Sequence, residues 1–327
     1  MAESARRPAP QRGVALLTVL LITALVSVLA VSMIERHRLS IAKTRQTLRY
    51  QQALDYALGG EAYARSLLRA DVEEDDAQPR TDSLADRWAE PTPPFEIPDG
   101  EIEIRIRDLS GLLNLNATVD VAARDRLKRL LRALGRDENL ADAIADWIDE
   151  DLEVSGAAGA EDGAYLLRAP AYRAANGPFA SVSELRLLPE IDEETWRTLV
   201  PFVAVLPTGV RRINVNTAPG PVLAALAPGL NPDQAAAFAF PEDPWAQPGD
   251  LVAQQAGFAP ELGMLTTQSR FFEVLVRAEY AGRTVTLRSH VFRDPETALT
   301  TVLRRDLGQR FGAWTRLADP TLPEEDG

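Results

Sequence analysis

An uncharged apolar run near the N-terminus constrains this chain more than any other feature. No charged residue occurs from Val14 to Ile34, and the only polar side chains are four hydroxyl residues, Thr18, Thr23, Ser27 and Ser32. As a helix rising about 1.5 Å per residue, the run would be about 30 Å long, the thickness of the hydrocarbon core of a bilayer. Hydroxyl groups can bond to the backbone of their own helix, so they are tolerated there. The run predicts one membrane-spanning helix over residues 14–34.

The charges that flank this run bear on its orientation. Three arginines and one glutamate precede it, which by the positive-inside rule places the N-terminus in the cytoplasm and the bulk of the chain outside. Basic residues also follow the run, among them Arg36, Arg38, Lys43 and Arg45, and they weaken this asymmetry. A cleaved secretory signal is the competing interpretation, but its apolar core spans only about 7–15 residues.

The helical pattern continues beyond the apolar run. Residues 35–70 contain no proline, and apolar residues recur there at mostly helical spacings. We therefore expect one long helix that leaves the membrane and packs on a globular head. The pair Gly59 and Gly60 is the expected position of a bend or break, because glycine weakens a helix interior.

The head has the pattern of an antiparallel sheet with a long insertion. Residues 71–98 are acidic and rich in proline, which predicts a loop or linker. Glu101–Arg107 then alternates polar and apolar residues, as a half-buried strand does. Its expected partners are Phe271–Tyr280 and Thr284–Phe292, joined by a short turn. The sequence thus predicts an α+β fold, with a sheet from residues 99–107 and 268–305, an all-α domain inserted at 108–267, and a tail at 306–327.

Two similar segments lie within the predicted insertion. Leu113–Thr118 and Ile213–Ala218 each alternate apolar residues with two asparagines, and each precedes a helical stretch. We expect the second asparagine of each segment to cap the following helix. The pattern is typical of helix-hairpin-helix repeats, some of which bind DNA. However, one of the predicted turns, Leu188–Asp192, is acidic, and the formal net charge of the chain is −13. A DNA-binding membrane receptor is therefore the alternative hypothesis, and a packing module the preferred one.

A group of acidic residues is the strongest local motif. Five of the carboxylates in two nearby clusters are candidate ligands, Asp146, Asp149, Asp151, Glu161 and Asp162, and a loop rich in Gly, Ala and Ser separates the clusters. Carboxylates this close repel one another unless they share a cation. Hard oxygen ligands without His or Cys favour calcium over zinc. A solvated acidic loop is the alternative, and Asp146 has a second interpretation as an exposed helical residue.

The sequence lacks the residues that most enzyme classes require. It has no cysteine and two histidines, and it shows neither a glycine-rich phosphate loop nor a G-x-S-x-G motif. These absences exclude disulfides and cysteine nucleophiles, and they leave little for histidine-based catalysis or metal binding. We therefore expect a protein without enzymatic activity.

Several motifs together resemble the minor pseudopilin K family of type II secretion systems. Gly13 before the apolar run is similar to the processing signal of pilins and pseudopilins. The segments DWIDED, GAEDGAY, AYRAAN and FASVSELRLLPEI and the second asparagine segment carry the rest of the resemblance. It implies a pilin-like fold and a place at the tip of the pseudopilus, where the protein helps to initiate assembly and export. The implied partners are the minor pseudopilins I and J, and no nucleic acid is implied.

The resemblance also implies roles for particular residues. A prepilin peptidase would remove residues 1–13 by cleaving between Gly13 and Val14. The head would lie in the periplasm, anchored to the bacterial inner membrane by a single span. Calcium would bind Asp149, Asp151, Glu161 and Asp162, with Asp146 as a less direct candidate. The fifth mature position, where most pseudopilins have a glutamate, is Thr18 here. A tip subunit has no neighbour above it to neutralise a buried acid, so the absence of this glutamate fits that position.

Overall fold

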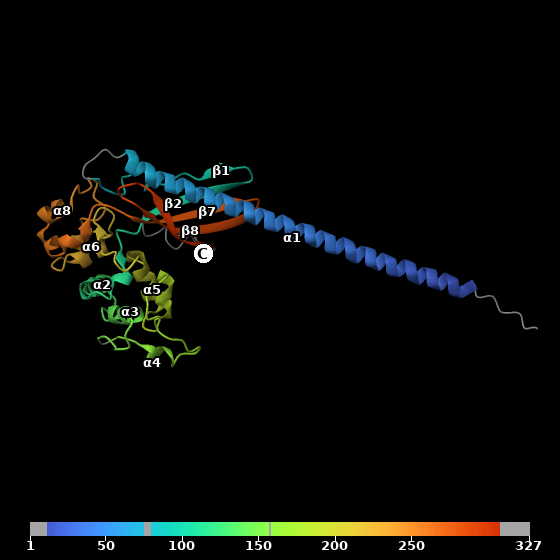
Figure 1. The fold of residues 1–327 in the computed structure, drawn as a ribbon, viewed down its shortest axis with the longest axis horizontal. Helices are drawn as coiled ribbons and strands as arrows, with labels where there is room; N and C mark the ends of the chain where they lie inside the picture. The colour runs from blue at the N-terminus through green and yellow to red at the C-terminus, as the bar shows by residue number, and fades with distance from the viewer. Residues whose placement is uncertain (1–11, 75–79, 157, 308–327) are drawn as a thin grey trace, which may run out of the picture.

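One helix dominates the shape of the molecule (Figure 1). The computed structural model describes residues 12–74, 80–156 and 158–307. Helix α1 runs from Arg12 to Glu74 without interruption, over 63 residues. The four hydroxyl residues of its apolar part each donate to a backbone carbonyl three or four residues earlier, as expected, at 2.8 to 2.9 Å. This part of α1 is exposed, and its length and composition are sufficient to cross a membrane.

The glycine pair in α1 does not interrupt the helix, so the predicted bend at Gly59 and Gly60 is wrong. Gly60 instead faces the sheet at close range. A Cβ atom there would lie 2.7 Å from Cγ1 of Val276 and 3.2 Å from Cγ2 of Ile102, whereas one at Gly59 would meet nothing within 4 Å. Gly60 therefore permits the close approach of helix and sheet.

The different surroundings of Gly59 and Gly60 predict different effects on stability when each is replaced by alanine. Gly59→Ala should stabilise the protein by up to about 1 kcal/mol, because alanine favours the helix. Gly60→Ala gains the same propensity but forces a methyl group into Val276, so we expect it to be less stable than Gly59→Ala by about 1–3 kcal/mol. Urea unfolding of the two variants in detergent measures the difference. Equal stabilities would show that the contact at Gly60 is relaxed at no cost.

The second half of α1 lies on an antiparallel sheet of five strands in the order β1-β2-β7-β8-β9. The predicted strands are confirmed. Residues 71–98 are not entirely loop, because α1 continues to Glu74 and β1 lies within this segment. The strand bounds are β1 Phe95–Ile97, β2 Gly100–Asp108, β7 Phe271–Tyr280, β8 Arg283–Arg293 and β9 Thr300–Leu307.

The core between α1 and the sheet combines small and large side chains. Ala53, Ala57 and Ala64 of α1 are fully buried, which lets the helix lie close to the strands. Val274 and Val276 of β7 are fully buried against them. The alternation of each strand thus turns one face of the sheet toward the helix.

The chain between β2 and β7 forms a largely helical body at one end of the sheet, away from the exposed part of α1 (Figure 1). This body has a hydrophobic core of its own. It also contains two short parallel strand pairs, β3 with β4 and β5 with β6, which the prediction of an all-α insertion did not include. Its helices are α2 Val121–Ala133, α3 Leu140–Ile148, α4 Asp162–Tyr165, α5 Glu193–Leu199, α6 Gly220–Leu226, α7 Pro232–Ala236 and α8 Pro248–Gln254. The paired strands are β3 Leu113–Asn114, β4 Val203–Ala204, β5 Ile213–Asn214 and β6 Leu265–Thr266.

The two asparagine segments join distant parts of this body. The side chain of Asn116 accepts from the amide of Phe179 and donates to the carbonyl of the same residue. Asn216 makes the same pair of bonds with the backbone of Trp245. The prediction that Asn116 and Asn216 cap the following helices is therefore wrong. Asp120 caps α2 instead.

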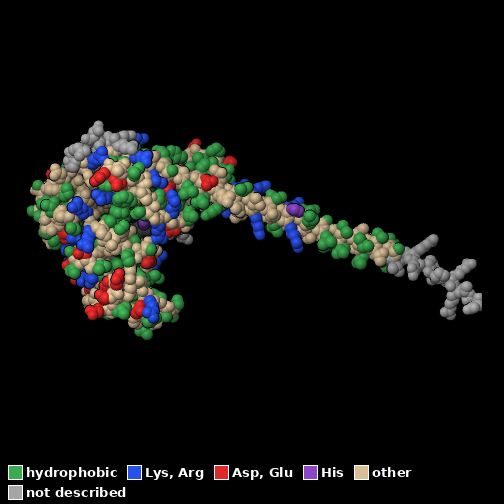
Figure 2. Space-filling model, in the orientation of Figure 1, with side chains coloured by type: hydrophobic (Ala, Val, Ile, Leu, Met, Phe, Trp, Pro, Cys, Tyr) green, Lys and Arg blue, Asp and Glu red, His purple; other side chains and the backbone are tan. Residues whose placement is uncertain are grey.

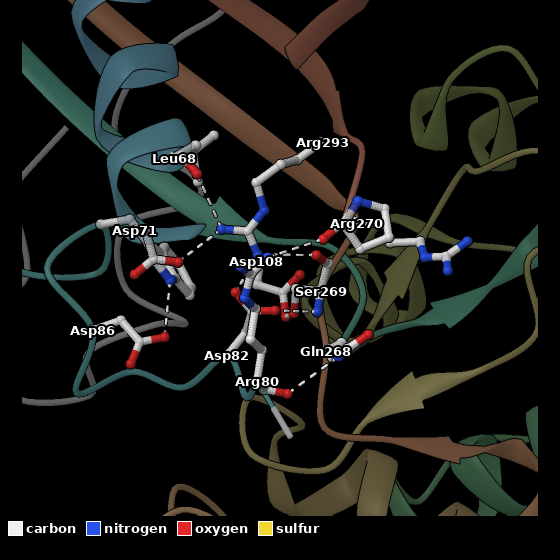
Figure 3. A network of polar contacts seen from close by, with 12 residues as sticks. Leu68, Asp71, Arg80, Asp82, Asp86, Asp108, Gln268, Ser269, Arg270 and Arg293 are labelled. Carbon is white, nitrogen blue, oxygen red and sulfur yellow. Dashed lines mark hydrogen bonds and ion pairs between the residues drawn. The ribbon is translucent and has the colours of Figure 1, made fainter. Parts of the chain in front are cut away.

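A buried network around Arg293 joins the helix, the sheet and the start of the insertion (Figure 3). Arg293 is 2% exposed and pairs with Asp71, at 2.8 Å from Nη1, and with Asp82. The Ser269 amide donates to Asp82 at 2.6 Å, and its hydroxyl donates to Asp108. Burial raises the pKa of Asp82 and Asp108, and it raises the pKa of Asp71 to about 6. Arg293 and Ser269 thus together bind three buried carboxylates, those of Asp71, Asp82 and Asp108.

Candidate metal centre

The acidic motif lies at the far end of the insertion from the sheet, between α3 and α4 (Figure 1). Helix α3 ends at Ile148, and Asp149 has extended backbone that leads into the loop. Gly156 has a φ of +61°, and a Cβ atom there would lie 2.1 Å from Oδ2 of Asp142. A Cβ atom at Gly159 would lie 2.4 Å from Oδ2 of Asp146. The two glycines therefore let the loop fold tightly against Asp142 and Asp146 of α3.

The loop brings three of the five predicted carboxylates together. Asp149, Asp151 and Glu161 each offer one oxygen, and these oxygens all lie within 4.8 Å of one another. Glu161 is 7% exposed, Asp149 is half-buried, and Asp151 reaches solvent. Three negative groups at this separation, with partial burial, favour a shared cation.

The hydrogen bonds of the cluster are incomplete. Both carboxylate oxygens of Glu161 and one oxygen each of Asp149 and Asp146 are buried without a hydrogen-bond partner among the described residues. Burial of a carboxylate oxygen is costly unless a donor or a cation compensates it. The residues therefore fit a bound cation, and the all-oxygen set fits calcium best.

The acid strengths of the cluster reflect the same crowding. Burial, followed by the charges of Asp146 and Asp149, raises the pKa of Glu161 from 4.5 to about 7. Burial and the charges of Asp151 and Asp146 raise the pKa of Asp149 from 3.8 to about 6. A cation that binds this group would therefore compete with protons.

The other two predicted carboxylates have different positions. Asp146 is completely buried, so its interpretation as an exposed helical residue is wrong. One of its oxygens accepts from the Ser155 amide at 2.9 Å. Asp162 lies apart from the group of three. Its carboxylate accepts from Arg173 at 3.0 Å and from the Ala174 amide at 3.1 Å, so its charge is already compensated.

Asn176 lies beside the cluster and offers a further oxygen ligand, which was not predicted from the sequence. Its side-chain nitrogen donates to the carbonyl of Asp151 at 3.4 Å, while its Oδ1 is buried without a partner. Its φ of +44° lies in the left-handed region, which asparagine tolerates better than most residues. Amide oxygens are common calcium ligands. The sequence placed Asn176 within a motif but gave no sign that it folds back toward Asp151.

A second acidic group in the described part of the chain has a different character. Oxygens of Asp71, Asp82 and Asp86 also lie within 4.8 Å of one another. Arg293 pairs with Asp71 and Asp82, and Asp86 accepts from the backbone amide of Ser83 at 2.7 Å. The guanidinium of Arg293 thus supplies the positive charge that a metal ion would otherwise supply. We therefore interpret this acidic group as part of the contact between helix and sheet.

The predicted processing and assembly residues lie at the start of α1. Gly13 and Val14 belong to its first turn, but their side chains lie outside the described residues, as do residues 1–11 of the predicted leader. The Thr18 hydroxyl donates to the carbonyl of Ala15 at 2.9 Å. Residues 308–327, most of the predicted tail, also lie outside the described residues.

A helix with an exposed apolar first half and a second half packed on an antiparallel sheet defines a pilin-like protein. The models of the family described as type II secretion system protein K match residues 107–208 and 213–268. The type II secretion system protein K of Pseudomonas aeruginosa is 38% identical over 315 residues, covering 91% of this chain and 93% of the relative. That of Klebsiella pneumoniae is 37% identical over 249 residues, covering 71% of each chain. The chain belongs to the type II secretion system protein K family.

A solved structure is also similar. It is a chain in the crystal structure of the GspK-GspI-GspJ complex of the type II secretion system of enterotoxigenic Escherichia coli. The TM-score is 0.73 at 27% sequence identity, and the match covers 82% of this chain and all of the other. The predicted resemblance to the K family is thereby confirmed, and the family is that of a minor pseudopilin of type II secretion.

Proposed function

We propose that the protein occupies the tip of a type II secretion pseudopilus, in a complex with the minor pseudopilins I and J, where it helps to initiate assembly and export. The observation that carries this proposal is the structural match, over 82% of this chain and all of the other, to a chain from a complex of these three components. Helix α1 anchors the chain in the inner membrane, and the head lies in the periplasm. The role is that of an assembly subunit and requires no catalytic group.

We propose that maturation removes residues 1–13. The peptide bond between Gly13 and Val14 joins a basic leader to the apolar run, which must remain to anchor the subunit. Intact-mass spectrometry of the chain from cells with an active prepilin peptidase should show a mature protein that begins at Val14, and cells without the peptidase should keep the leader. A mature terminus after Ile34 would contradict the proposal.

Thr18 carries a prediction about position in the fibre. At the tip no neighbouring ammonium group lies above this residue, so Thr18→Glu should give no gain in pseudopilus assembly and should reduce it, because an acid in an apolar helix bundle is unpaired. Thr18→Gln, which has the same shape without the charge, is the matched control and should assemble better than the glutamate variant. Assembly is measured as sheared pseudopili from cells. Improved assembly with Thr18→Glu would place the subunit inside the filament.

The helix-hairpin-helix character of the insertion is supported by an internal repeat. Each asparagine segment begins a unit with a short strand, and a second strand, parallel to the first, ends the unit. In the first unit β3 pairs with β4, and in the second β5 pairs with β6. The two family models divide the chain between the same units. Asn116 and Asn216 make equivalent pairs of bonds in the two units. We infer that the insertion consists of two related packing modules.

No observation favours the alternative of a DNA receptor. The comparisons identify a secretion component. In the predicted turn Leu188–Asp192, the carboxylate of Asp192 accepts from the Thr195 amide at 2.7 Å and so caps α5 itself. A carboxylate already fills the position that a phosphate would need.

We further propose that the cluster between α3 and α4 binds calcium. Asp149, Asp151 and Glu161 would hold the ion, and Asp146 and Asn176 have oxygens free to assist. Bound calcium would supply the positive charge that compensates these carboxylates and ties the loop to α3. Asp162, which Arg173 already compensates, would have a structural role.

A further inference from the structure

A ring of cations surrounds α1 where the apolar run ends. This basic collar consists of Arg36, Arg38, Lys43, Arg45 and Arg49. All five side chains are exposed, and none forms an ion pair with any residue that the structure describes. Figure 2 shows their blue side chains on both sides of the helix, between the head and its apolar end. The collar is a concentrated positive charge in a chain whose formal net charge is −13.

The collar begins at the depth of the lipid headgroups. At about 1.5 Å per residue, Arg36 and Arg38 lie about 3 and 6 Å beyond Ile34, and the headgroup layer of one leaflet is about 5–8 Å thick. Side chains on a helix lean toward its N-terminus, which here means toward the membrane. The long stems of Lys43 and Arg45 therefore extend their charges back toward the headgroups.

The distribution of the collar around α1 fits lipid better than a protein partner. At about 100° per residue, Arg36 and Lys43 share one face of the helix. By the same spacing, Arg38, Arg45 and Arg49 share the opposite face. A docked protein helix covers one face, whereas lipids surround a membrane helix on all sides. Lipids that surround the helix can neutralise both charged faces at once.

We propose that the basic collar binds the headgroups of anionic phospholipids, such as phosphatidylglycerol, in the leaflet that adjoins the head. Phosphate oxygens of the lipids pair with Arg36 and Arg38, and the remaining cations of the collar add attraction to the anionic surface; together they fix the depth of α1 in the membrane. The inference rests on the proposed insertion of α1 into the inner membrane.

The full chain in vesicles of phosphatidylcholine and phosphatidylglycerol tests this. Spin-labelled forms of each lipid report how much of it is immobilised at the protein surface. We expect phosphatidylglycerol to be preferred about fivefold, the ratio for about 1 kcal/mol of attraction per cation near an anionic surface. The preference should fall as salt is added, because salt screens exposed charges.

Variants separate the two faces of the collar. The preference should fall in part when one face is neutralised by Arg36→Gln and Lys43→Gln. It should also fall in part when the other face is neutralised by Arg38→Gln, Arg45→Gln and Arg49→Gln. All five substitutions together should abolish it. The matched control neutralises three exposed arginines of the head that form no described ion pair, and it should keep the full preference. Its substitutions are Arg87→Gln, Arg168→Gln and Arg212→Gln.

The outcomes distinguish the collar from the anchor. Immobilised lipid with no preference for phosphatidylglycerol would overturn the collar proposal alone. A preference that survives all five substitutions, or that the control variant also loses, would overturn it as well. Absence of immobilised lipid of either kind would overturn the insertion of α1, and the collar proposal with it.

Discussion

Replacing Arg293 by methionine is expected to lower the free energy of unfolding by about 3–5 kcal/mol, the range for breaking a buried ion pair from one side. The guanidinium is 2% exposed and compensates Asp71 and Asp82. Methionine fills much of the same volume but leaves both carboxylates buried without a cation. The attractions of Asp82 and Asp71 outweigh burial and raise the pKa of Arg293, so it stays charged in the folded protein.

Urea unfolding of the full chain in detergent measures this loss. Arg197→Met is the matched control, because Arg197 is 73% exposed in its pair with Glu193, and exposed pairs contribute about 0–1 kcal/mol. Combining Arg293→Met with Asp71→Asn and Asp82→Asn should recover part of the stability, because the uncompensated charges are then absent. A loss no larger than that of Arg197→Met would contradict the role of the network.

The loss of stability caused by Arg293→Met should depend on pH. In the wild type, the pKa of Asp71 is about 6 in the folded state, above 3.8 when unfolded, so this group makes folding less favourable as pH rises through that window. Without Arg293 the carboxylates hold their protons more strongly. The deficit of Arg293→Met should therefore shrink below pH about 5 and reach its full size near neutrality.

Calcium is expected to raise the melting temperature of the protein by several degrees. A ligand that binds only the folded state at 100 times its Kd stabilises it by about 2.7 kcal/mol. In the insertion of about 160 residues, where 1 kcal/mol shifts the melting temperature by about 2–4 °C, that corresponds to about 5–11 °C. Magnesium should do less, since it requires a tight octahedral site and loses its water reluctantly. Calorimetry in calcium and in chelator measures both effects.

Two neighbouring carboxylates provide a matched pair of variants. Glu161→Gln should abolish the calcium response and should stabilise the protein in chelator, because it removes a charge from a crowded site. Asp162→Asn should keep the response, since Arg173 and the Ala174 amide already compensate that carboxylate. Identical melting of the wild type in calcium and in chelator would show that the cluster is a solvated acidic loop.

Calcium binding at the proposed site should depend on pH, because its carboxylates have raised pKa values. The folded pKa of Glu161 is about 7 and that of Asp149 about 6, so in chelator each group reduces stability as pH rises from about 4 toward 7. Calcium must displace these protons, and its affinity should increase over the same range. The melting curves in calcium and in chelator should therefore separate as pH rises. A constant separation from pH 5 to 8 would contradict the participation of these two residues.

Local patterns in the sequence were sufficient for the elements whose cause is local. The uncharged run and the absence of proline predicted α1, and strict alternation predicted β2. The spacing of acidic residues around a glycine-rich loop also indicated the group of Asp149, Asp151 and Glu161, which the structure brings together.

Features that depend on contacts between distant segments were missed or misjudged. Gly60 looked like a helix breaker because its neighbour across the interface, Val276, lies over 200 residues later. Asn116 looked like a helix cap because no sequence pattern pairs it with Phe179. The sequence also contained no sign that Arg173 pairs with Asp162, which it grouped with Glu161. The Arg293 network gave no sequence signal, since its members come from five separate segments.

The proposed pseudopilus tip joins this chain to the minor pseudopilins I and J. The most direct test is to express the three full-length proteins together, extract them in mild detergent, purify this chain by affinity and determine the mass of the complex. We expect one complex that contains all three proteins in equal amounts, and it should persist through size-exclusion chromatography. Purification of this chain alone, while I and J remain in the unbound fraction, would contradict the claim.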